Sequence, residues 1–211
     1  MADLTSLRRS PLQDMAAEIR KGAVPGDRSV WLLEWPFLSM VSIRVDPDSE
    51  AARRIEAVLG TSLPRSVGEV THQGAHTVLW LGPDEWLVVS QMKPETLVDG
   101  VPGASGGLRA SARGGHAAVV DVSANRTVLE VAGPGARELL EKGCPADLHP
   151  RSLGDDTAIA TTLARVPVLL WKVDTSLFRI LPRASFAPYV ASWLLDAVQE
   201  FAPRAPVDGG A

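Results

Sequence analysis

The stretch Leu79–Ser90, LWLGPDEWLVVS, places two tryptophans on either side of a Gly-Pro-Asp-Glu turn. Proline suits the second position of a type I turn and aspartate the third, so the stretch predicts a β-hairpin. With Pro83 and Asp84 at the centre, Trp80 would face Leu87, and the two indoles would point to opposite faces of the sheet. Both faces are then apolar, whereas an antiparallel hairpin with one solvated face alternates apolar and polar residues. We therefore expect helices to cover one face and a second sheet or a partner to cover the other.

The composition is that of an ordinary globular protein. The chain has 211 residues, of which 45% are hydrophobic and 22% charged, and its net charge is −4. A negative balance argues against non-specific binding to nucleic acid or to an anionic membrane. The single cysteine, Cys144, excludes an intrachain disulfide and suits a reducing compartment. Because no apolar run has the length of a signal peptide or a membrane span, we expect a soluble cytoplasmic protein.

The order strand-strand-helix-strand-strand-strand-helix occurs twice along the chain, which predicts an internal duplication. Leu79-Trp80 aligns with Leu170-Trp171, and without a gap Trp86 meets Leu177. In the clearest helical pattern, 185–201, apolar residues recur at helical spacing, so we expect this helix to belong to the core.

The duplication divides the chain into segments. We expect an N-terminal arm with little structure of its own at 1–29, a first α+β half at 30–102 and a second at 116–202. The segment 103–115 contains five glycines and predicts an exposed, flexible linker. A polar tail follows at 203–211, and the two halves together form one interlocked domain.

Two motifs carry a family resemblance. The segment Asp121–Gly143, DVSANRTVLEVAGPGARELLEKG, resembles the Asp-Val-Ser, strand, Val-x-Gly-Pro-x-Ala, helix segment of glycine-cleavage aminomethyltransferases. Arg9-Ser10-Pro11-Leu12 is similar to their Arg-Thr-Pro-Leu opening. With its length and the LGPDEWLVV stretch, the chain most resembles the gamma subunit family of heterotetrameric sarcosine oxidases, over about residues 9–201. The resemblance implies an α+β fold of two interlocked halves, each a helix-covered antiparallel sheet like the aminomethyltransferase folate-binding domain.

The resemblance also implies a role. The complex oxidatively demethylates sarcosine to glycine and forms 5,10-methylenetetrahydrofolate and hydrogen peroxide. This chain would be a non-catalytic subunit whose partners are the alpha, beta and delta subunits. FAD, FMN, NAD and tetrahydrofolate would sit in those partners, and this chain would bind none of them.

The chain departs from the folate-binding relatives at one motif. Those relatives carry Tyr-Thr-Gly-Glu-x-Gly-aromatic-Glu on a late strand, and Val173–Arg179, VDTSLFR, matches the last seven positions of this motif. Both glutamates are absent, and Arg179 replaces the second. The departure favours the oxidase subunit over the alternative, a stand-alone folate-dependent one-carbon-transfer or folate-binding protein. A stand-alone module that binds an unidentified protein is a third reading.

Other reactive residue types form no convincing site. His72 and His76 could share a strand face, but a zinc site needs further ligands, and His116 and His149 are distant in sequence. No base is visible beside Cys144, so a structural thiol is the better interpretation.

Three polar clusters are equally weak as sites, namely the acids Asp84 and Glu85, the turn Gly133-Pro134-Gly135 and the pair Arg109 and Arg113. The acids fit a solvated turn. The glycines fit a tight strand-to-helix connection better than a dinucleotide site. The arginines could grip an acidic partner or lie in a solvated loop. We therefore expect no catalytic, cofactor-binding or metal-binding residue in this chain.

Overall fold

The computed structural model of the chain describes residues 7–100 and 106–202. The remaining segments, 1–6, 101–105 and 203–211, lie outside the described residues, so the predicted C-terminal tail and parts of the predicted arm and linker are not placed. Within the described part, no helix combines the length and the apolar character that a membrane crossing requires.

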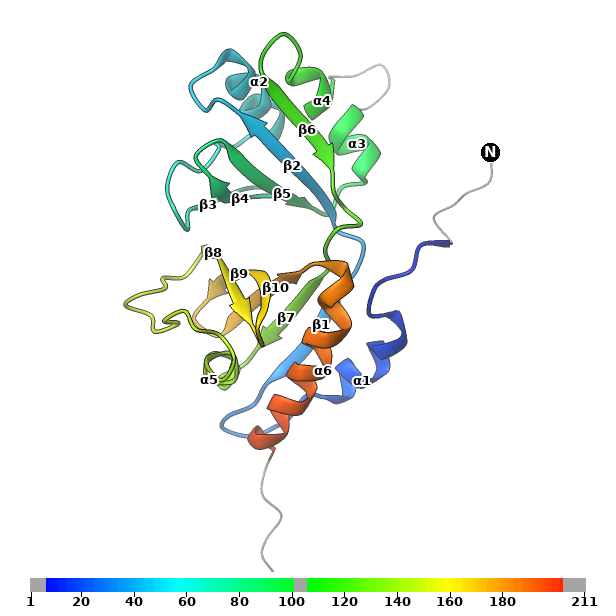
Figure 1. Cartoon of the computed structure of the whole chain (residues 1–211), viewed down its shortest axis with the longest axis vertical. Coiled ribbons are helices and arrows are strands. Elements are labelled where there is room, and N and C mark those ends of the chain that lie inside the picture. The colour runs from blue at the N-terminus through cyan, green and yellow to red at the C-terminus, as the bar shows by residue number, and fades with distance from the viewer. Residues whose placement is uncertain (1–6, 101–105, 203–211) are drawn as a thin grey trace, which may run out of the picture.

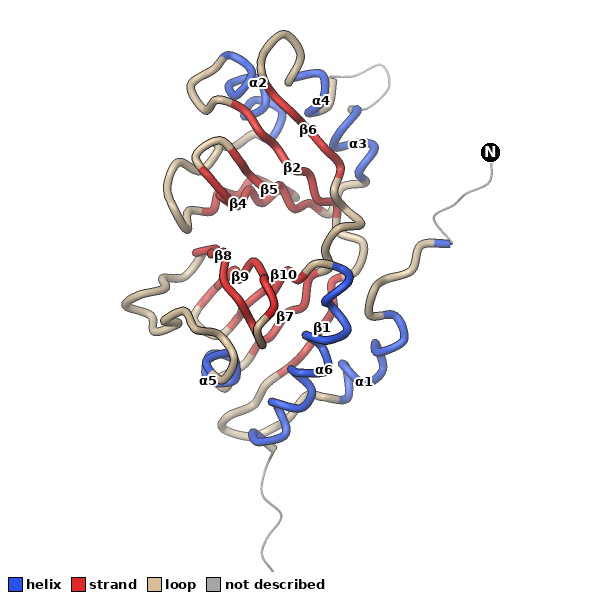
Figure 2. Tube along the Cα trace, viewed as in Figure 1, coloured by secondary structure: helices blue, strands red, loops and turns tan. Residues whose placement is uncertain are grey.

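Two five-stranded antiparallel sheets face each other, with helices on their outer sides (Figures 1 and 2). The first sheet has the order β3-β4-β5-β2-β6 and the second the order β1-β7-β10-β9-β8. The predicted fold class, α+β with duplicated antiparallel sheets, is confirmed. The strands of the first sheet are β2 (Ser39–Val45), β3 (Val70–Gln73), β4 (His76–Gly82), β5 (Glu85–Ser90) and β6 (Ala117–Asp121). Those of the second are β1 (Trp31–Trp35), β7 (Val128–Ala132), β8 (Thr157–Leu163), β9 (Val166–Asp174) and β10 (Leu177–Pro182).

The two repeats exchange their first strands. β1 pairs with β7, so that Trp31 faces Ala132, and β6 pairs with β2, so that Val45 faces Ala117. Each sheet therefore takes four strands from one repeat and one edge strand from the other, β6 in the first sheet and β1 in the second. The predicted halves, 30–102 and 116–202, consequently differ from the sheets, because periodicity tells which face of a strand is buried but not which sheet the strand joins.

Helices cover the outer face of each sheet, and each begins or ends at a recognisable signal. Ser49 caps α2, where its Oγ accepts a hydrogen bond from the Ala52 amide at 3.2 Å, and Gly60 ends the helix at φ 71°. The helices over the first sheet are α2 (Glu50–Leu59), α3 (Pro94–Asp99) and α4 (Leu108–Ser111). Those over the second are η2 (Gln13–Met15), α1 (Ala16–Lys21), α5 (Ala136–Glu141), η3 (Ala184–Phe186), α6 (Ala187–Ala197) and η4 (Val198–Phe201).

The predicted arm and linker are both more structured than composition suggested. Leu12 and Ile19 of the arm are 0% and 2% exposed and join the core of the second sheet. In the linker, α4 buries Leu108 completely. A Cβ at Gly107 would lie 2.5 Å from the Val98 carbonyl oxygen, so this glycine permits a close approach and does not mark a flexible chain. The prediction of an exposed linker is therefore wrong for the buried residues Gly107, Leu108, Ser111 and Ala112, whereas the other described residues of 106–115 are exposed.

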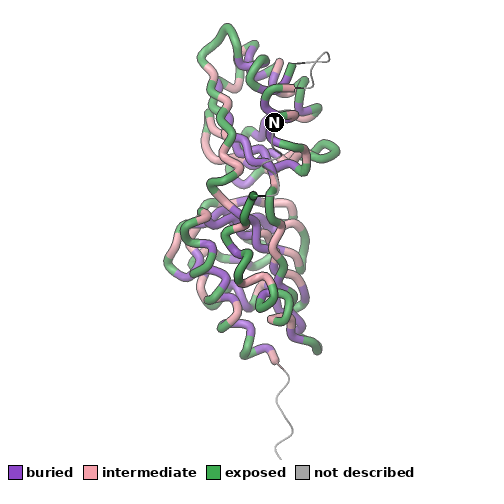
Figure 3. The backbone as a smooth tube through the Cα atoms, turned by 90° about the vertical axis from the view of Figure 1, so that its right-hand side faces the viewer, coloured by how far each residue is buried: buried purple, intermediate pink, exposed green. Residues whose placement is uncertain are grey.

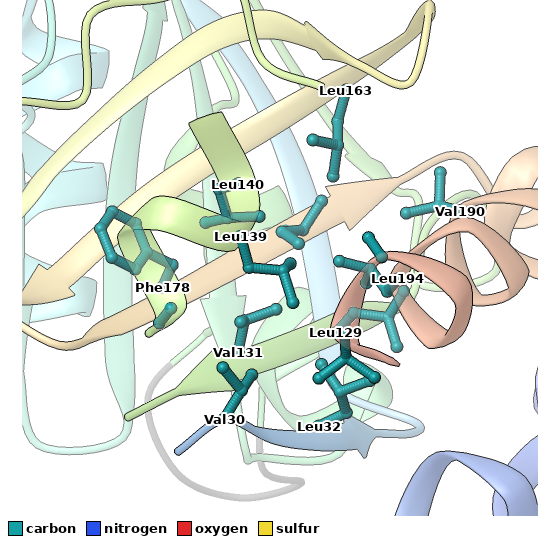
Figure 4. Close-up of a cluster of buried hydrophobic side chains, with 14 of the residues drawn as sticks. Val30, Leu32, Leu129, Val131, Leu139, Leu140, Leu163, Phe178, Val190 and Leu194 are labelled. Carbon is teal, nitrogen blue, oxygen red and sulfur yellow. The ribbon is translucent and has the colours of Figure 1, made fainter. Parts of the chain in front are cut away.

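Apolar side chains form three clusters, one under the helices of each sheet and one between the sheets. Burial is concentrated inside both layers, and exposed residues follow the loops (Figure 3). Under the second sheet's helices, Val190 and Leu194 of α6 and Leu139 of α5 pack toward Leu129 and Val131 of β7 (Figure 4). The expectation that the last long helix belongs to the core is confirmed, although its α-helical part begins at Ala187, after the 3₁₀ turn η3.

The hairpin β4–β5 is covered on both faces, as predicted. Val78 and Trp86 lie in the cluster under the helices, whereas Leu79 and Leu87 lie in the cluster between the sheets. The predicted register is wrong by one residue, because the ladder is irregular between Trp80 and Gly82. Trp80 therefore pairs with Trp86, and both indoles are on the helix-covered face. The second hairpin, with Leu170 and Trp171, is buried on both faces in the same way.

Candidate functional site

A cavity of about 520 Å³ opens between the two sheets and is large enough for a small ligand. Its walls come from the β3–β4 and β5 ends of the first sheet and from β1, β9 and β10 of the second. It includes Arg179, the residue that replaces the second glutamate of the folate-binding motif. The lining residues are Trp35, Leu38, His72, Gly74, Ala75, His76, Thr77, Val89, Ser90, Gln91, Asp156, Trp171, Val173 and Arg179.

A group of polar contacts joins the two sheets at one side of this cavity, and we call its residues His72, Thr77, Asp156 and Trp171 the clasp. The His72 Nε2 atom on β3 lies 2.7 Å from Asp156 Oδ1, just before β8. The indole Nε1 of Trp171 donates to the same oxygen at 3.2 Å, and its ring stacks on the His72 ring with centroids 5.6 Å apart. His72 Nδ1 is 3.1 Å from Thr77 Oγ1. The clasp thus engages both ring nitrogens of His72 in contacts within the chain.

Arg179 packs against two indoles, one of which, Trp171, also contacts His72 and Asp156. Its guanidinium carbon is 5.3 Å from the Trp35 ring centroid and 4.9 Å from that of Trp171. Its Nε donates to Glu130 Oε2 at 3.0 Å, and the two side chains are 26% and 13% exposed. A guanidinium that stacks on aromatic faces and pairs with a neighbouring carboxylate is held in place by the protein itself. Trp35 Nε1 is the one buried side-chain polar atom without a partner among the described residues.

His76 is the remaining titratable wall residue, and burial lowers its pKa. Its Nδ1 is 3.1 Å from the hydroxyl of Ser90. The cavity brings His72 and His76 to the same wall, but the described residues contain no group of three or more histidine, cysteine or acidic side chains that could hold a metal ion.

The predicted acids of the β4–β5 turn lie away from the cavity. Glu85 pairs with Arg44 at 2.6 Å, Asp84 is 3.8 Å from the same guanidinium, and these contacts raise the pKa of Arg44, the Glu85 hydrogen bond most of all. The Asp84 and Arg44 side chains are each 58% exposed, so the group is a solvated ion cluster at the turn.

The contacts of the other weak candidates are structural as well, since each is made within this chain. Gly133, at φ 116°, lies so close to Ser29 that a side chain would clash with the Ser29 backbone, and α5 begins three residues later. Cys144 is buried, and its Sγ is 3.8 Å from the Thr161 hydroxyl. Arg109 pairs with Asp99 of the same chain at 2.6 Å.

Sequence reasoning singled out His72, His76 and Arg179 but missed the partners of His72 and Arg179. His72 and Asp156 are 84 positions apart, and Glu130 and Arg179 are 49 apart, so neither pair has a local pattern. The buried Lys172, 1% exposed, was also missed: its Nζ donates to the Leu153 carbonyl at 2.9 Å and pairs with Asp155 at 3.0 Å. This contact lowers the pKa of Asp155. A lysine on an otherwise apolar strand is the one signal that could have pointed to it.

Comparison with known proteins gives a consistent result. Residues 44–200 match the sarcosine oxidase, gamma subunit family. The chain is 45% identical to the sarcosine oxidase subunit gamma of Corynebacterium sp. (strain U-96) over 202 residues, which are 95% of each chain. It is also 45% identical to that of Arthrobacter sp. over 203 residues, which are 96% of this chain and 95% of the relative.

Solved structures show the same likeness. The chain resembles one in a structure described as heterotetrameric sarcosine oxidase from Corynebacterium sp. U-96 in complex with pyrrole 2-carboxylate. Its TM-score is 0.86 at 42% identity, over 94% of this chain and 98% of that one. Glycine cleavage system aminomethyltransferase T from Bartonella henselae has a TM-score of 0.61 at 13% identity, over 90% of this chain and 57% of that one. At that identity the likeness is one of fold alone.

Proposed function

The chain belongs to the sarcosine oxidase gamma subunit family, and on that premise we propose that it is a non-catalytic subunit of a heterotetrameric sarcosine oxidase. The assembled enzyme oxidatively demethylates sarcosine to glycine, and 5,10-methylenetetrahydrofolate and hydrogen peroxide are formed. The partners of this chain are the alpha, beta and delta subunits, and the complex works in the cytoplasm.

One observation carries the non-catalytic assignment: the ionic groups around the cavity are paired with each other. Arg179 pairs with Glu130, and His72 pairs with Asp156. A histidine that acts as a general acid or base needs one ring nitrogen turned toward its substrate even when a carboxylate orients the other, and Asp156 and the Thr77 hydroxyl occupy both ring nitrogens of His72. The His72–Asp156 pair joins the two sheets, and the Arg179–Glu130 pair links the neighbouring strands β10 and β7 of the second sheet, so both pairs act in the architecture of the subunit.

The same cavity argues against the stand-alone folate reading. The stretch Val173–Arg179 provides an arginine where folate-binding relatives provide a carboxylate, and Arg179 is engaged by Glu130 and two indoles. A pterin ring presents hydrogen-bond donors that a guanidinium cannot accept. We therefore assign tetrahydrofolate, FAD, FMN and NAD to the partner subunits and none of them to this chain.

Co-purification tests the assignment. This chain, carrying an affinity tag, is co-expressed with the alpha, beta and delta genes of its own operon or genome. The expected product is a single species with one copy of each subunit, a flavin absorbance spectrum and sarcosine-dependent peroxide formation. Recovery of the tagged chain without flavoprotein, while the other three subunits form an active complex, would refute the proposal.

A second measurement separates the folate alternative. The chain purified alone should be colourless and should release no heat on titration with tetrahydrofolate. Stoichiometric binding at micromolar affinity would favour a folate-binding protein instead. A Arg179→Glu variant is a useful control, because it restores the carboxylate of the motif without restoring the rest of the site.

A further inference from the structure

The guanidinium of Arg179 has donor atoms that the fold does not use. Its Nε donates to Glu130 Oε2 at 3.0 Å, whereas Nη1 and Nη2 form no hydrogen bond within residues 7–100 and 106–202. In this described part of the chain Trp35 Nε1 is the one buried side-chain polar atom without a partner, so both terminal nitrogens of Arg179 are open to solvent. Most of the N–H donors of an arginine belong to these two nitrogens. Because Arg179 lines the cavity between the sheets, a ligand in the cavity can accept hydrogen bonds from them.

The same guanidinium is held rigidly by its neighbours. Its carbon lies 5.3 Å from the Trp35 ring centroid and 4.9 Å from that of Trp171, and Glu130 fixes Nε. The plane of the guanidinium therefore has a fixed direction before a ligand binds, and a preorganised group loses little conformational entropy on binding. The parallel N–H groups of a guanidinium match the two oxygens of a carboxylate. This part of the wall is therefore suited to a planar anion.

The rest of the wall limits the charge and the size of that anion. Asp156, the acidic residue of the lining, already contacts His72 and accepts a hydrogen bond from Trp171. Glu130 balances part of the Arg179 charge, so a phosphate dianion would bring a charge without a partner into the cavity, which is costly away from water. A monocarboxylate brings less charge and still uses both terminal nitrogens. The volume, about 520 Å³, lies in the range of pockets that enclose small organic ligands.

We propose that the cavity is a binding site for a small monocarboxylate with an apolar body, whose two oxygens accept hydrogen bonds from Arg179 Nη1 and Nη2. The apolar body lies against the apolar part of the lining, which consists of Leu38, Val89 and Val173. Folate-binding relatives have a carboxylate at the position of Arg179, and the guanidinium reverses this part of the wall from acceptor to donor. The site requires no catalytic group in this chain, and it does not depend on which complex the chain joins.

The test uses the full-length chain and 4-fluorobenzoate as the probe, because the ring is apolar and the fluorine resonance broadens on binding. A titration followed by the fluorine line width should give one site per chain with a dissociation constant below about 1 mM. The neutral isostere 4-fluorobenzamide should bind at least about tenfold more weakly, since the charge-assisted pair of hydrogen bonds is lost. Equal affinity for the acid and the amide would overturn the proposal without any change in the protein.

The protein side of the test is Arg179→Lys, which keeps the positive charge but not the planar fork. It should weaken 4-fluorobenzoate binding at least about tenfold. The matched control is Arg44→Lys, because Arg44 is also paired with a glutamate but lies at the β4–β5 turn, away from the cavity, and it should leave the affinity unchanged. Unchanged affinity in Arg179→Lys, with the near-UV circular dichroism of the wild-type chain, would overturn the proposal. If this variant loses its native spectrum, the comparison of acid and amide decides.

Two further outcomes identify the source of the carboxylate. In the assembled oxidase, the part of the binding that Arg179→Lys removes should persist. Its absence would show that a partner subunit fills the cavity, and it would overturn the proposal of a free ligand. Displacement of the probe by micromolar tetrahydrofolate would make the cavity a folate site, which would overturn both this proposal and the assignment of folate to the partner subunits.

Discussion

Replacing Arg179 by glutamine tests whether contacts within the second sheet hold that wall of the cavity in place. The substitution removes the ion pair with Glu130 and the stacking on Trp35 and Trp171 while keeping a polar side chain. Breaking a fully buried pair costs about 3–5 kcal/mol, and an exposed pair is worth about 0–1 kcal/mol. At 26% and 13% exposure the pair lies between these limits, at about 1–3 kcal/mol. The two lost cation–π contacts add roughly 0.5–1 kcal/mol each.

We therefore expect Arg179→Gln to lower the free energy of unfolding by about 2–5 kcal/mol in urea denaturation. Glu130→Gln should lower the free energy of unfolding by less, because the Arg179 guanidinium still stacks on both indoles. A double-mutant cycle between the two positions should give a coupling energy of about 1–2 kcal/mol. Arg179→Lys, which keeps the charge but not the planar fork, is the matched control and should fall between wild type and glutamine. A loss below about 0.5 kcal/mol with no coupling would show that Arg179 is not structural and is free for a ligand.

Three further outcomes follow from the same structure. Leu194→Ala, at a position that is 1% exposed, should lower the free energy of unfolding by about 2–5 kcal/mol in thermal or urea denaturation. The control Leu195→Ala, at a half-buried neighbour, should lower it clearly less. Equal losses for the two variants would contradict the core assignment of α6. The double change Asp84→Asn and Glu85→Gln should leave sarcosine turnover of the assembled enzyme within about twofold, and abolished turnover in an intact complex would make the turn catalytic. Burial lowers the pKa of His76, so the unfolded chain binds its proton more readily than the folded chain. Stability should therefore fall as pH drops through 6.5, the ordinary value for histidine, and His76→Gln should lose less stability between about pH 7 and 5 than the wild-type chain. Parallel pH profiles for the two proteins would contradict this assignment.

Local periodicity was sufficient for much of the fold. The apolar faces of the β4–β5 hairpin predicted cover on both sides, and the apolar spacing around Leu194 predicted a core helix. Both depend on neighbours within a turn or a strand pair, where side-chain direction follows from the backbone. The departure of Val173–Arg179 from the folate-binding motif was also visible, and the structure places Arg179 in the wall of the cavity.

Longer-range features were not predictable from periodicity. The ungapped alignment of the repeats failed across the second hairpin, because Leu79 faces Leu87 whereas Leu170 faces Ile180, which makes that hairpin two residues longer. The pairing of His72 with Asp156 depends on how the two sheets stack, and no short pattern records it. The glycine content of 106–115 predicts flexibility, although Gly107 allows the chain to approach the Val98 carbonyl closely.

The exchange of β1 and β6 has a consequence for how the chain folds. β1 finds β7 only across about a hundred residues of chain, and such long loop closures slow folding because their entropy is lost before the contacts form. Neither sheet is complete until both repeats have been made, so we expect one cooperative unfolding transition. The fragments 1–100 and 106–202 should each remain largely unfolded alone, since each holds the edge strand of the other. When they are mixed, circular dichroism should recover the native spectrum, and independent folding of either fragment would contradict the exchange.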